Sequence, residues 1–362
     1  MTPWAKRADM VVHRAEPFNA EPPRAALAAD GPTPLDAFYV RSHGPVPDLD
    51  PARFRMRVDG LVDRALELSL DDLRGRFAEH EIAATLQCAG NRRAGLIAVR
   101  DIPGEAPWGP GATATAVWRG VRLADVLAAA GLRPEAQHVA FLGADESPEA
   151  QPPQRFGGSI ARHKALAGEV LLAWTMNGAP LPAVHGAPLR VVVPGYIGAR
   201  SVKWLERVAA QEAPSDNWFQ ASSYRLLPPD ADPDAAGPGA GVALGAVAVN
   251  ADILEPDDGD VIAAGPVRVA GYAFAGDDRR IVRVDVSTDG GRSWRQAALR
   301  DQPSPWTWRR WAARVDLPPG PGEIVARAWD SAGATQPADP AELWNPKGYA
   351  NNAWARVRVT AR

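Results

Sequence analysis

Cysteine is almost absent from the sequence, because Cys88 is the only one in 362 residues. A single thiol excludes an internal disulfide, an iron–sulfur cluster bound by this chain alone, a C-x-x-C-H haem attachment and a thiolate zinc cage. A disulfide to another molecule stays open, although a reducing compartment disfavours it. The lone cysteine is therefore either a small buried apolar residue or a soft ligand for a metal.

Strong net charge and long apolar runs are missing as well. The formal net charge is -3 and the pI is near 6.1, so no global basic field indicates a nucleic-acid partner. No apolar run approaches the length of a membrane span, and the N-terminal MTPWAKRADMVVH lacks the apolar core of a secretory signal. We therefore expect a cytoplasmic protein without a membrane or nucleic-acid partner, provided that no leader peptide has been removed.

The length of the chain predicts two or three domains. All six histidines lie between positions 13 and 185, so polar chemistry is concentrated around Cys88 in the first half. Residues 1–35 carry prolines and no sustained period, which predicts an extended lead-in. We expect a main domain over 36–225, a linker rich in proline, glycine and aspartate over 226–241, and a second domain over 242–362.

The main domain has the pattern of mixed strands and helices. Strands are expected at 38–40, 80–88, 138–142, 170–175 and 189–193. Residues 54–70 predict a hairpin that turns at Asp59-Gly60, residues 100–120 a loop, and residues 155–160 a loop that leads into a helix. Ser69 and Asp72 predict a capped helix start, and residues 121–130 a helix closed by Gly131.

The second domain alternates apolar and polar residues along short strands separated by turns. Asp289-Gly290-Gly291 is a hairpin signal between Val286 and Trp294. Such strands over about 120 residues predict a β-sandwich of immunoglobulin-like type. The fold class is therefore α+β, a mixed α/β domain followed by this sandwich.

The stretch TLQCAGNRR, residues 85–93, joins the lone thiol to two adjacent arginines, Arg92 and Arg93. A thiolate is a soft metal ligand, and two guanidinium groups beside it would form a cationic floor for an oxyanion. The alternative is a buried cysteine followed by an exposed turn. Composition alone favours that alternative.

Two further stretches are open to two interpretations. In FYVRSHGPVP, alternation would put Arg41 and His43 on one side of a strand end, although such residues are more often surface residues. In HGAPLRVVVPGYIGARSVKWL, main-chain N–H groups of the glycine-rich loop could bind a phosphate together with Arg200 and Lys203. The alternative for the second stretch is a plain strand–turn–strand.

These three motifs, with LWNPKGYANNAWARVRV near the C-terminus, resemble the sulfite oxidase family of molybdopterin enzymes over nearly the whole chain. EPFNAEPP near the start is similar to haem-free members of the plant and bacterial type. The resemblance implies a molybdenum–molybdopterin cofactor without haem or flavin. It also implies a molybdopterin-binding catalytic domain over 36–225 and an immunoglobulin-like dimerisation domain over 242–362.

The resemblance further implies roles for individual residues. Cys88 matches the cysteine that ligates molybdenum. The positions that match the substrate pocket are Arg41, Arg93, Trp108, Tyr224 and Lys347. The positions that match cofactor binding are Tyr39, Val40, Arg41, Ser42, His43, Asp145, His185, Arg190, Ser201, Val202 and Lys203. Arg92 has no match, and we interpret it as a structural or surface charge.

The sequence departs from the family at several points. Ser42 stands where many members have asparagine, and the stretch after Asp145 is not typical. Lys347 stands where animal members have an arginine of the anion pocket, so the charge is kept and the bidentate fork is lost. We expect no haem-binding domain before the main domain, and we expect electrons to leave to oxygen or to a separate carrier protein.

The implied reaction is the two-electron oxidation of sulfite to sulfate by a homodimer. A related oxidoreductase, a nitrate reductase or another sulfur-compound dehydrogenase, would need a similar anion pocket and is the alternative. A third interpretation is a non-enzymatic dimerising module that has lost its cofactor. The intact Cys88, Arg93, His185 and Lys203 argue against that third interpretation.

Overall fold

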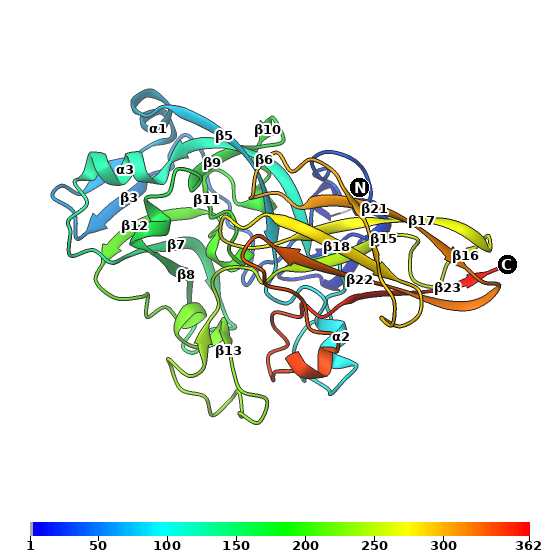
Figure 1. Cartoon of the computed structure of the whole chain (residues 1–362). Coiled ribbons are helices and arrows are strands. Elements are labelled where there is room, and N and C mark those ends of the chain that lie inside the picture. The colour runs from blue at the N-terminus through cyan, green and yellow to red at the C-terminus, as the bar shows by residue number, and fades with distance from the viewer. Residues whose placement is uncertain (1–2) are drawn as a thin grey trace.

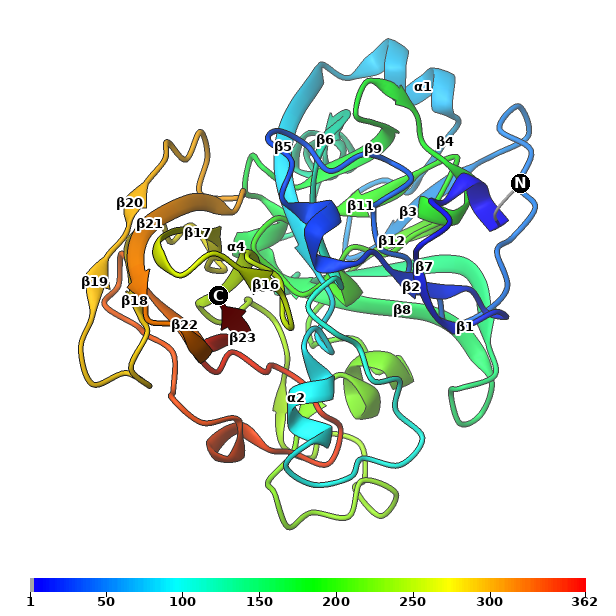
Figure 2. The same ribbon diagram turned by 90° about the vertical axis from the view of Figure 1, so that its right-hand side faces the viewer.

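The computed structural model describes residues 3–362 and consists of two sheet-rich parts in contact with each other (Figures 1 and 2). The first part contains the α-helices and two five-stranded sheets, and the second part is built from a four-stranded and a five-stranded sheet. Among the described residues, no helix has the length and apolar character needed to cross a membrane.

Two sheets form the body of the first part. One has the order β10-β9-β6-β5, with β11 also paired to β9, and the other has the order β4-β3-β12-β7-β8. The strands of the first sheet are β5 (Glu79–Gln87), β6 (Thr113–Arg122), β9 (Leu171–Met176), β10 (Ala179–Pro180) and β11 (Arg190–Val192). Those of the second are β3 (Met56–Gly60), β4 (Leu66–Leu68), β7 (His138–Ser147), β8 (Gln154–Ala161) and β12 (Leu205–Gln211).

Short helices connect these strands, and two of them begin or end as their sequences predict. Helix α1 (Leu70–Arg76) starts with the expected capping box, because Asp72 N–H donates to Ser69 Oγ at 3.0 Å and Ser69 N–H donates to the Asp72 carboxylate at 2.9 Å. Helix α3 (Leu123–Ala130) ends at Gly131, whose φ of 73° is the left-handed cap expected there. The remaining helices are α2 (Arg93–Ile97) and α4 (Arg162–Ala165).

The predicted hairpin over 54–70 exists, but its predicted turn is wrong. Strands β3 and β4 pair in antiparallel fashion, and Asp59-Gly60 lies at the end of β3 rather than in the turn. A Cβ on Gly60 would lie 2.1 Å from Ala210 O, and the residue has a φ of 84°. The glycine therefore permits the close approach of β12, a contact that the local sequence does not contain.

Three other segments differ from their predictions. Residues 38–40 form no strand, since Val40 makes only an isolated bridge with Ala20. Residues 113–122, expected in a loop up to residue 120 and in a helix from residue 121, form β6, whose small residues are largely buried between neighbouring strands. Residues 154–161 form β8 instead of a loop, although the expected helix follows directly as α4. The glycines that suggested a loop are tolerated there because Gly157 lies against Phe141 O of β7.

The second part is a β-sandwich around its own apolar core. Its sheets have the orders β15-β17-β21-β20 and β16-β23-β22-β18-β19. The strands are β15 (Asn250–Glu255), β16 (Val261–Ile262), β17 (Gly265–Phe274), β18 (Ile281–Ser287), β19 (Arg295–Gln296), β20 (Ala298–Leu299), β21 (Arg309–Leu317), β22 (Gly320–Asp330) and β23 (Ala355–Ala361). Strands β18 and β19 pair across the predicted turn, where Gly290 and Gly291 have positive φ, so this hairpin is confirmed.

Two further segments lie outside these four sheets. The lead-in forms a small hairpin of β1 (Val11–Arg14) and β2 (Asn19–Glu21) on the first part (Figure 2). Residues 227–241 are a mostly exposed loop whose ends are joined by pairing of β13 (Arg225–Leu226) with β14 (Val242–Ala243).

Arg92 joins the two parts. It follows the Cys88 turn with a φ of 63°, and its guanidinium donates to Ala353 O at 2.9 Å and Trp354 O at 3.1 Å. The core cluster of the first part also extends into the second part, where it includes Tyr272 and Phe274. The orientation of the two parts is therefore set by apolar packing and by this arginine, which is structural.

Replacement of Arg92 by methionine is expected to lower the free energy of unfolding by about 3–6 kcal/mol, because its two hydrogen bonds from a charged donor contribute about 1.5–3 kcal/mol each. Chemical denaturation monitored by tryptophan fluorescence measures the loss. Arg119→Met is the matched control, since Arg119 makes only an exposed ion pair with Glu81, whose removal costs about 0–1 kcal/mol. Equal losses in both variants would contradict the bridging role.

Candidate functional site

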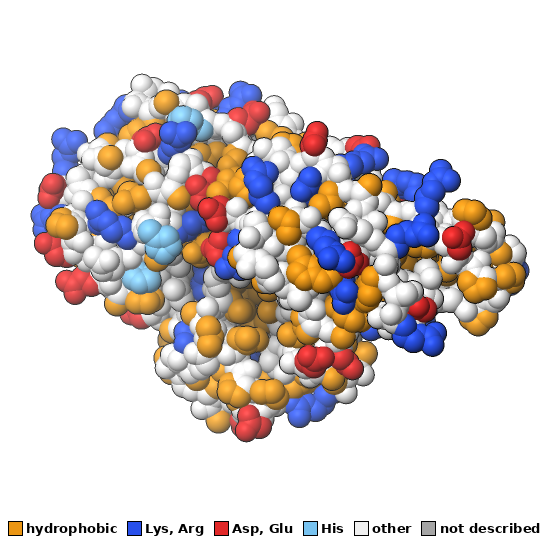
Figure 3. Space-filling model, viewed as in Figure 1, with side chains coloured by type: hydrophobic (Ala, Val, Ile, Leu, Met, Phe, Trp, Pro, Cys, Tyr) orange, Lys and Arg blue, Asp and Glu red, His pale blue; other side chains and the backbone are white. Residues whose placement is uncertain are grey.

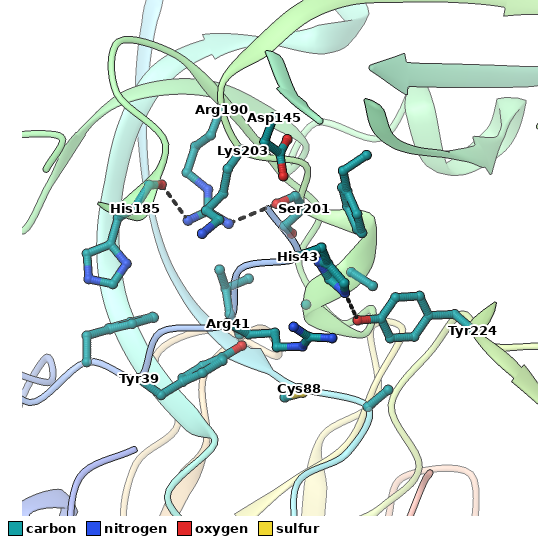
Figure 4. A pocket seen from close by; sticks show the side chains of 16 residues that line it. Tyr39, Arg41, His43, Cys88, Asp145, His185, Arg190, Ser201, Lys203 and Tyr224 are labelled. Atoms are coloured by element: carbon teal, nitrogen blue, oxygen red, sulfur yellow. Dashed lines mark hydrogen bonds between the residues drawn. The ribbon is translucent and has the colours of Figure 1, made fainter. Parts of the chain in front are cut away.

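Strands and loops of the first part enclose a cavity with about 620 Å³ of space not filled by protein atoms, part of it open to solvent. Its polar wall is shown in Figure 4. Residues with a predicted site role that line it are Tyr39, Arg41, His43, Cys88, Asp145, His185, Arg190, Ser201, Lys203 and Tyr224. The structure thus brings together residues that lie as far apart as positions 39 and 224.

Cys88 stands at the floor of this cavity. It follows the last residue of β5, and its N–H donates to Ala112 O at 2.9 Å. The residue is 7% exposed, and burial raises the pKa of its thiol while Arg93 and Arg41 lower it. A metal would have to displace the thiol proton, as metal binding to cysteine does. A position in a polar cavity wall favours the ligand interpretation over apolar filler.

One side of the cavity is cationic. The Arg190 guanidinium donates to His185 O and to Ser201 O, both at 2.9 Å (Figure 4). Lys203 Nζ donates to Ser42 Oγ at 2.8 Å. Ser42 therefore supports Lys203 from behind the wall and does not itself line the cavity. These groups fix the loops around β11 and present positive charge to the cavity, as a phosphate site requires.

Asp145 faces Lys203 in the same wall. The residue is 3% exposed and its Oδ1 has no hydrogen-bond partner in the protein. Burial raises the pKa of Asp145 to about 7, against the lowering effect of Lys203. Burial also lowers the pKa of Lys203, and Asp145 raises it. A buried polar atom without a partner is costly, so a donor group of a bound molecule would stabilise this position.

His43 and Tyr224 form a hydrogen bond on the opposite side, with 2.7 Å between His43 Nε2 and Tyr224 Oη (Figure 4). Burial lowers the pKa of His43, with contributions from Arg41 and Lys203, so the imidazole is neutral, and its Nε2 donates or accepts this bond according to the tautomer. The His43 ring stacks on Phe156 with a centroid distance of 4.4 Å. The phenol is thus held at the cavity by a rigid partner.

Arg41 projects into the cavity between Tyr224 and Cys88 (Figure 4). Its guanidinium donates to Ser42 O at 2.6 Å and pairs with Glu149 at 3.1 Å. Arg41 and His43 line the same cavity, which confirms the expectation that they share a side.

Several predicted residues lie outside the lining. Arg93 is 3% exposed and pairs with Glu105 at 2.9 Å, and its guanidinium also donates to Ala106 O and Gly348 O. Lys347 Nζ donates to Ser222 O at 3.0 Å. Trp108 is buried with its ring 4.5 Å from that of His13. Val40 and Val202 are buried in apolar clusters. The roles of these residues remain predictions.

Arg200 also points elsewhere, because its guanidinium donates to Leu244 O at 2.7 Å and 3.1 Å. It therefore joins the glycine-rich loop to the segment that follows the linker. Of the two cations considered for a phosphate in that loop, only Lys203 lines the cavity.

Sequence reasoning missed the apolar part of the wall and one lysine. The missed lining residues are Phe38, Leu86, Ala89, Phe156, Gly198 and Ala199. Lys6, from the lead-in, is 4% exposed and its Nζ lies 2.8 Å from both Phe38 O and His185 Nε2. Burial lowers the pKa of Lys6 to about 7. No local pattern marks Lys6, because its partners are brought to it only by the fold.

Among residues 3–362, no group of three or more histidine, cysteine, aspartate or glutamate side chains could hold a metal ion on its own. A metal at Cys88 would therefore need further ligands from a bound cofactor. The cavity supplies one thiol, a cationic wall and an unpartnered carboxylate oxygen. This donor set fits an anionic cofactor that carries its own metal ligands and N–H donors.

Comparison with known proteins gives two family matches and several relatives. The family described as "Oxidoreductase molybdopterin binding domain" matches residues 43–219, and "Mo-co oxidoreductase dimerisation domain" matches residues 242–362. The sulfite oxidase of Gallus gallus is 44% identical over 95% of this chain and 76% of its own length. The sulfite oxidase of Arabidopsis thaliana is 36% identical over 96% of this chain and 92% of its own length.

The chain spans 65% of the mitochondrial sulfite oxidase of Mus musculus, with 41% identity. Among solved structures, the sulfane dehydrogenase SoxCD from Paracoccus pantotrophus is similar with a TM-score of 0.78 and 27% identity, over 96% of this chain and 88% of that one. The likeness thus covers both parts of the chain.

Proposed function

The chain belongs to the sulfite oxidase family of molybdopterin-dependent oxidoreductases, and on this premise we propose that it oxidises sulfite to sulfate. The observation that carries the proposal is the cavity in which Cys88, Arg41 and Tyr224 meet a cationic wall. A molybdenum–molybdopterin cofactor would fit this donor set, with Cys88 as the protein ligand of the metal and with Lys203, Arg190 and His185 as the residues that would hold the anionic part of the cofactor.

The bound cofactor supplies the two-electron oxidation and the oxygen transfer. The protein's own residues bind and orient the substrate. Arg41 offers charge-assisted hydrogen bonds to a sulfur oxyanion beside Cys88. In the neutral tautomer in which His43 Nε2–H donates to Tyr224 Oη, the single phenol O–H is free to donate to the oxyanion. The apolar wall around Phe156 limits the water that reaches the reacting group. Electrons leave to oxygen or to a separate carrier protein.

The second part completes the proposed assembly. We assign residues 242–362 to an immunoglobulin-like sandwich that pairs two copies of the chain, which the match to a dimerisation domain supports. Sedimentation equilibrium of the purified protein tests this assignment. A strictly monomeric chain at micromolar concentration would contradict it.

Metal analysis and steady-state kinetics test the function. We expect about one molybdenum per chain, and turnover of sulfite but not of nitrate. Oxygen, ferricyanide and a cytochrome, compared side by side, identify the acceptor class. A chain with no molybdenum would favour the non-enzymatic interpretation, whereas molybdenum with nitrate turnover alone would favour the related reductase.

Arg93→Gln is expected to raise the KM for sulfite about tenfold and to leave kcat nearly unchanged. The substitution removes a positive charge close enough to Cys88 to lower its pKa and leaves Glu105 unpaired, so the site repels anions more strongly. A hydrogen bond from a charged group contributes about 1.5–3 kcal/mol, which is consistent with this effect. Initial rates against sulfite concentration measure it. A fall in kcat at constant KM would contradict a role in binding the anion.

A further inference from the structure

Each of the two arginines with a predicted role in the anion pocket is paired with its own glutamate. Arg41 Nη2 lies 3.1 Å from Glu149 Oε2, and Arg93 Nη1 lies 2.9 Å from Glu105 Oε2. The glutamate side chains are 27% and 33% exposed, so both carboxylates are partly shielded from solvent. Carboxylates beside an anion site oppose the binding of anions, which calls for a physical reason.

Hydrogen bonding of the arginines does not supply that reason. The Arg93 guanidinium already donates to Ala106 O at 3.0 Å and Gly348 O at 3.2 Å, and that of Arg41 donates to Ser42 O at 2.6 Å. The carbonyl oxygens hold both guanidinium groups in place without any carboxylate. Glu105 and Glu149 lie on the loops before β6 and before β8, where a charge can be added without disturbing a sheet.

Near this end of the cavity, the charges of Arg41 in the lining and of residues outside the lining leave a small positive excess. Lys347, whose pKa is lowered by burial and raised by Glu105 and Asp234, adds a third cation to Arg41 and Arg93. Asp234 is exposed to solvent, so its charge is screened. Glu105 and Glu149 offset two of these three charges. Arg14, which also pairs with Glu149, is about half exposed to solvent and is screened there.

We propose that Glu105 and Glu149 limit the charge of the anion pocket, so that it favours a singly charged oxyanion over a doubly charged one. Sulfite near neutral pH exists partly as the singly charged hydrogensulfite, whereas sulfate is doubly charged. A carboxylate in a partly buried site repels a dianion twice as strongly as a monoanion. The two glutamates therefore weaken the hold on the product and speed its release. The identity of these anions rests on the proposed function.

The test compares two tetrahedral anions that differ mainly in charge, sulfate and perchlorate. Calorimetry on the oxidised holoenzyme measures their dissociation constants for the wild type, Glu105→Gln and Glu149→Gln. Glu323→Gln is the control, because Glu323 pairs with Arg356 at 2.7 Å on the second part. Molybdenum content is determined for each preparation, and Glu149→Gln carries the test if Glu105→Gln loses cofactor.

For each pocket variant we expect sulfate to bind about tenfold more tightly, a change of about 1.4 kcal/mol. Perchlorate should bind only about threefold more tightly, because the Coulomb energy is proportional to the charge of the ion. The control should change neither constant. A sulfate-to-perchlorate ratio that is the same in the wild type and both variants would overturn the inference. Calorimetry needs no turnover, so a protein that fails to oxidise sulfite would refute the proposed function and still test the pocket charge.

Discussion

Cys88→Ser is expected to abolish the oxidation of sulfite, with turnover at least about 100-fold below that of the wild type. The oxygen of serine is a hard and far less acidic ligand than a thiolate, so it does not replace sulfur on a soft metal. Loss of a residue that merely orients a metal ligand already costs about 10–100-fold in activity or affinity. Steady-state rates with sulfite and a saturating acceptor measure the effect.

The variant also separates a ligand from a packing residue. Cys88 is buried at the end of β5, and serine is nearly the same size, so thermal unfolding should change by only a few degrees. Circular dichroism and the melting curve supply this control on the same preparation. Unimpaired turnover in Cys88→Ser would refute the assignment of Cys88 as metal ligand.

Lys203→Met is expected to lower the cofactor content of the purified protein by about tenfold or more. Methionine keeps the length of the side chain and removes the cation that faces Asp145 in the wall. The substitution removes a positive charge from the wall. Without Lys203 the pKa of Asp145 also rises further, so the Asp145 carboxylate becomes protonated near neutral pH. Charge-assisted hydrogen bonds of about 1.5–3 kcal/mol account for the size of the loss.

Molybdenum and pterin contents per chain, determined by mass spectrometry, measure this loss. Lys164→Met is the matched control, because Lys164 is also buried but pairs with Glu169 at 2.6 Å and does not line the cavity. That variant should lose stability and keep its cofactor. If Lys203→Met retains a full complement, Lys203 is not part of the cofactor site.

Interactions within a few residues were predictable from the sequence. The capping box of Ser69 and Asp72, the glycine cap at Gly131 and the strand that runs into Cys88 follow from local hydrogen bonds and alternation. The motif resemblance also named ten residues that line one cavity, although roles beyond the lining stay predictions.

Partners far apart in the chain were decided only by the tertiary structure. Gly60 suggested a turn but permits the close approach of β12, and the glycines of β8 suggested a loop but lie in a strand beside β7. Both predictions were wrong because the local sequence does not contain the neighbouring strand that explains the glycine. Lys6 meets His185 across 179 positions, and Arg41 meets Glu149 across 108. The scarcity of cysteine singled out Cys88 as the residue to explain. The charge that surrounds it depends on which loops the fold brings together, since the free energy of such contacts comes from packing and burial rather than from local sequence.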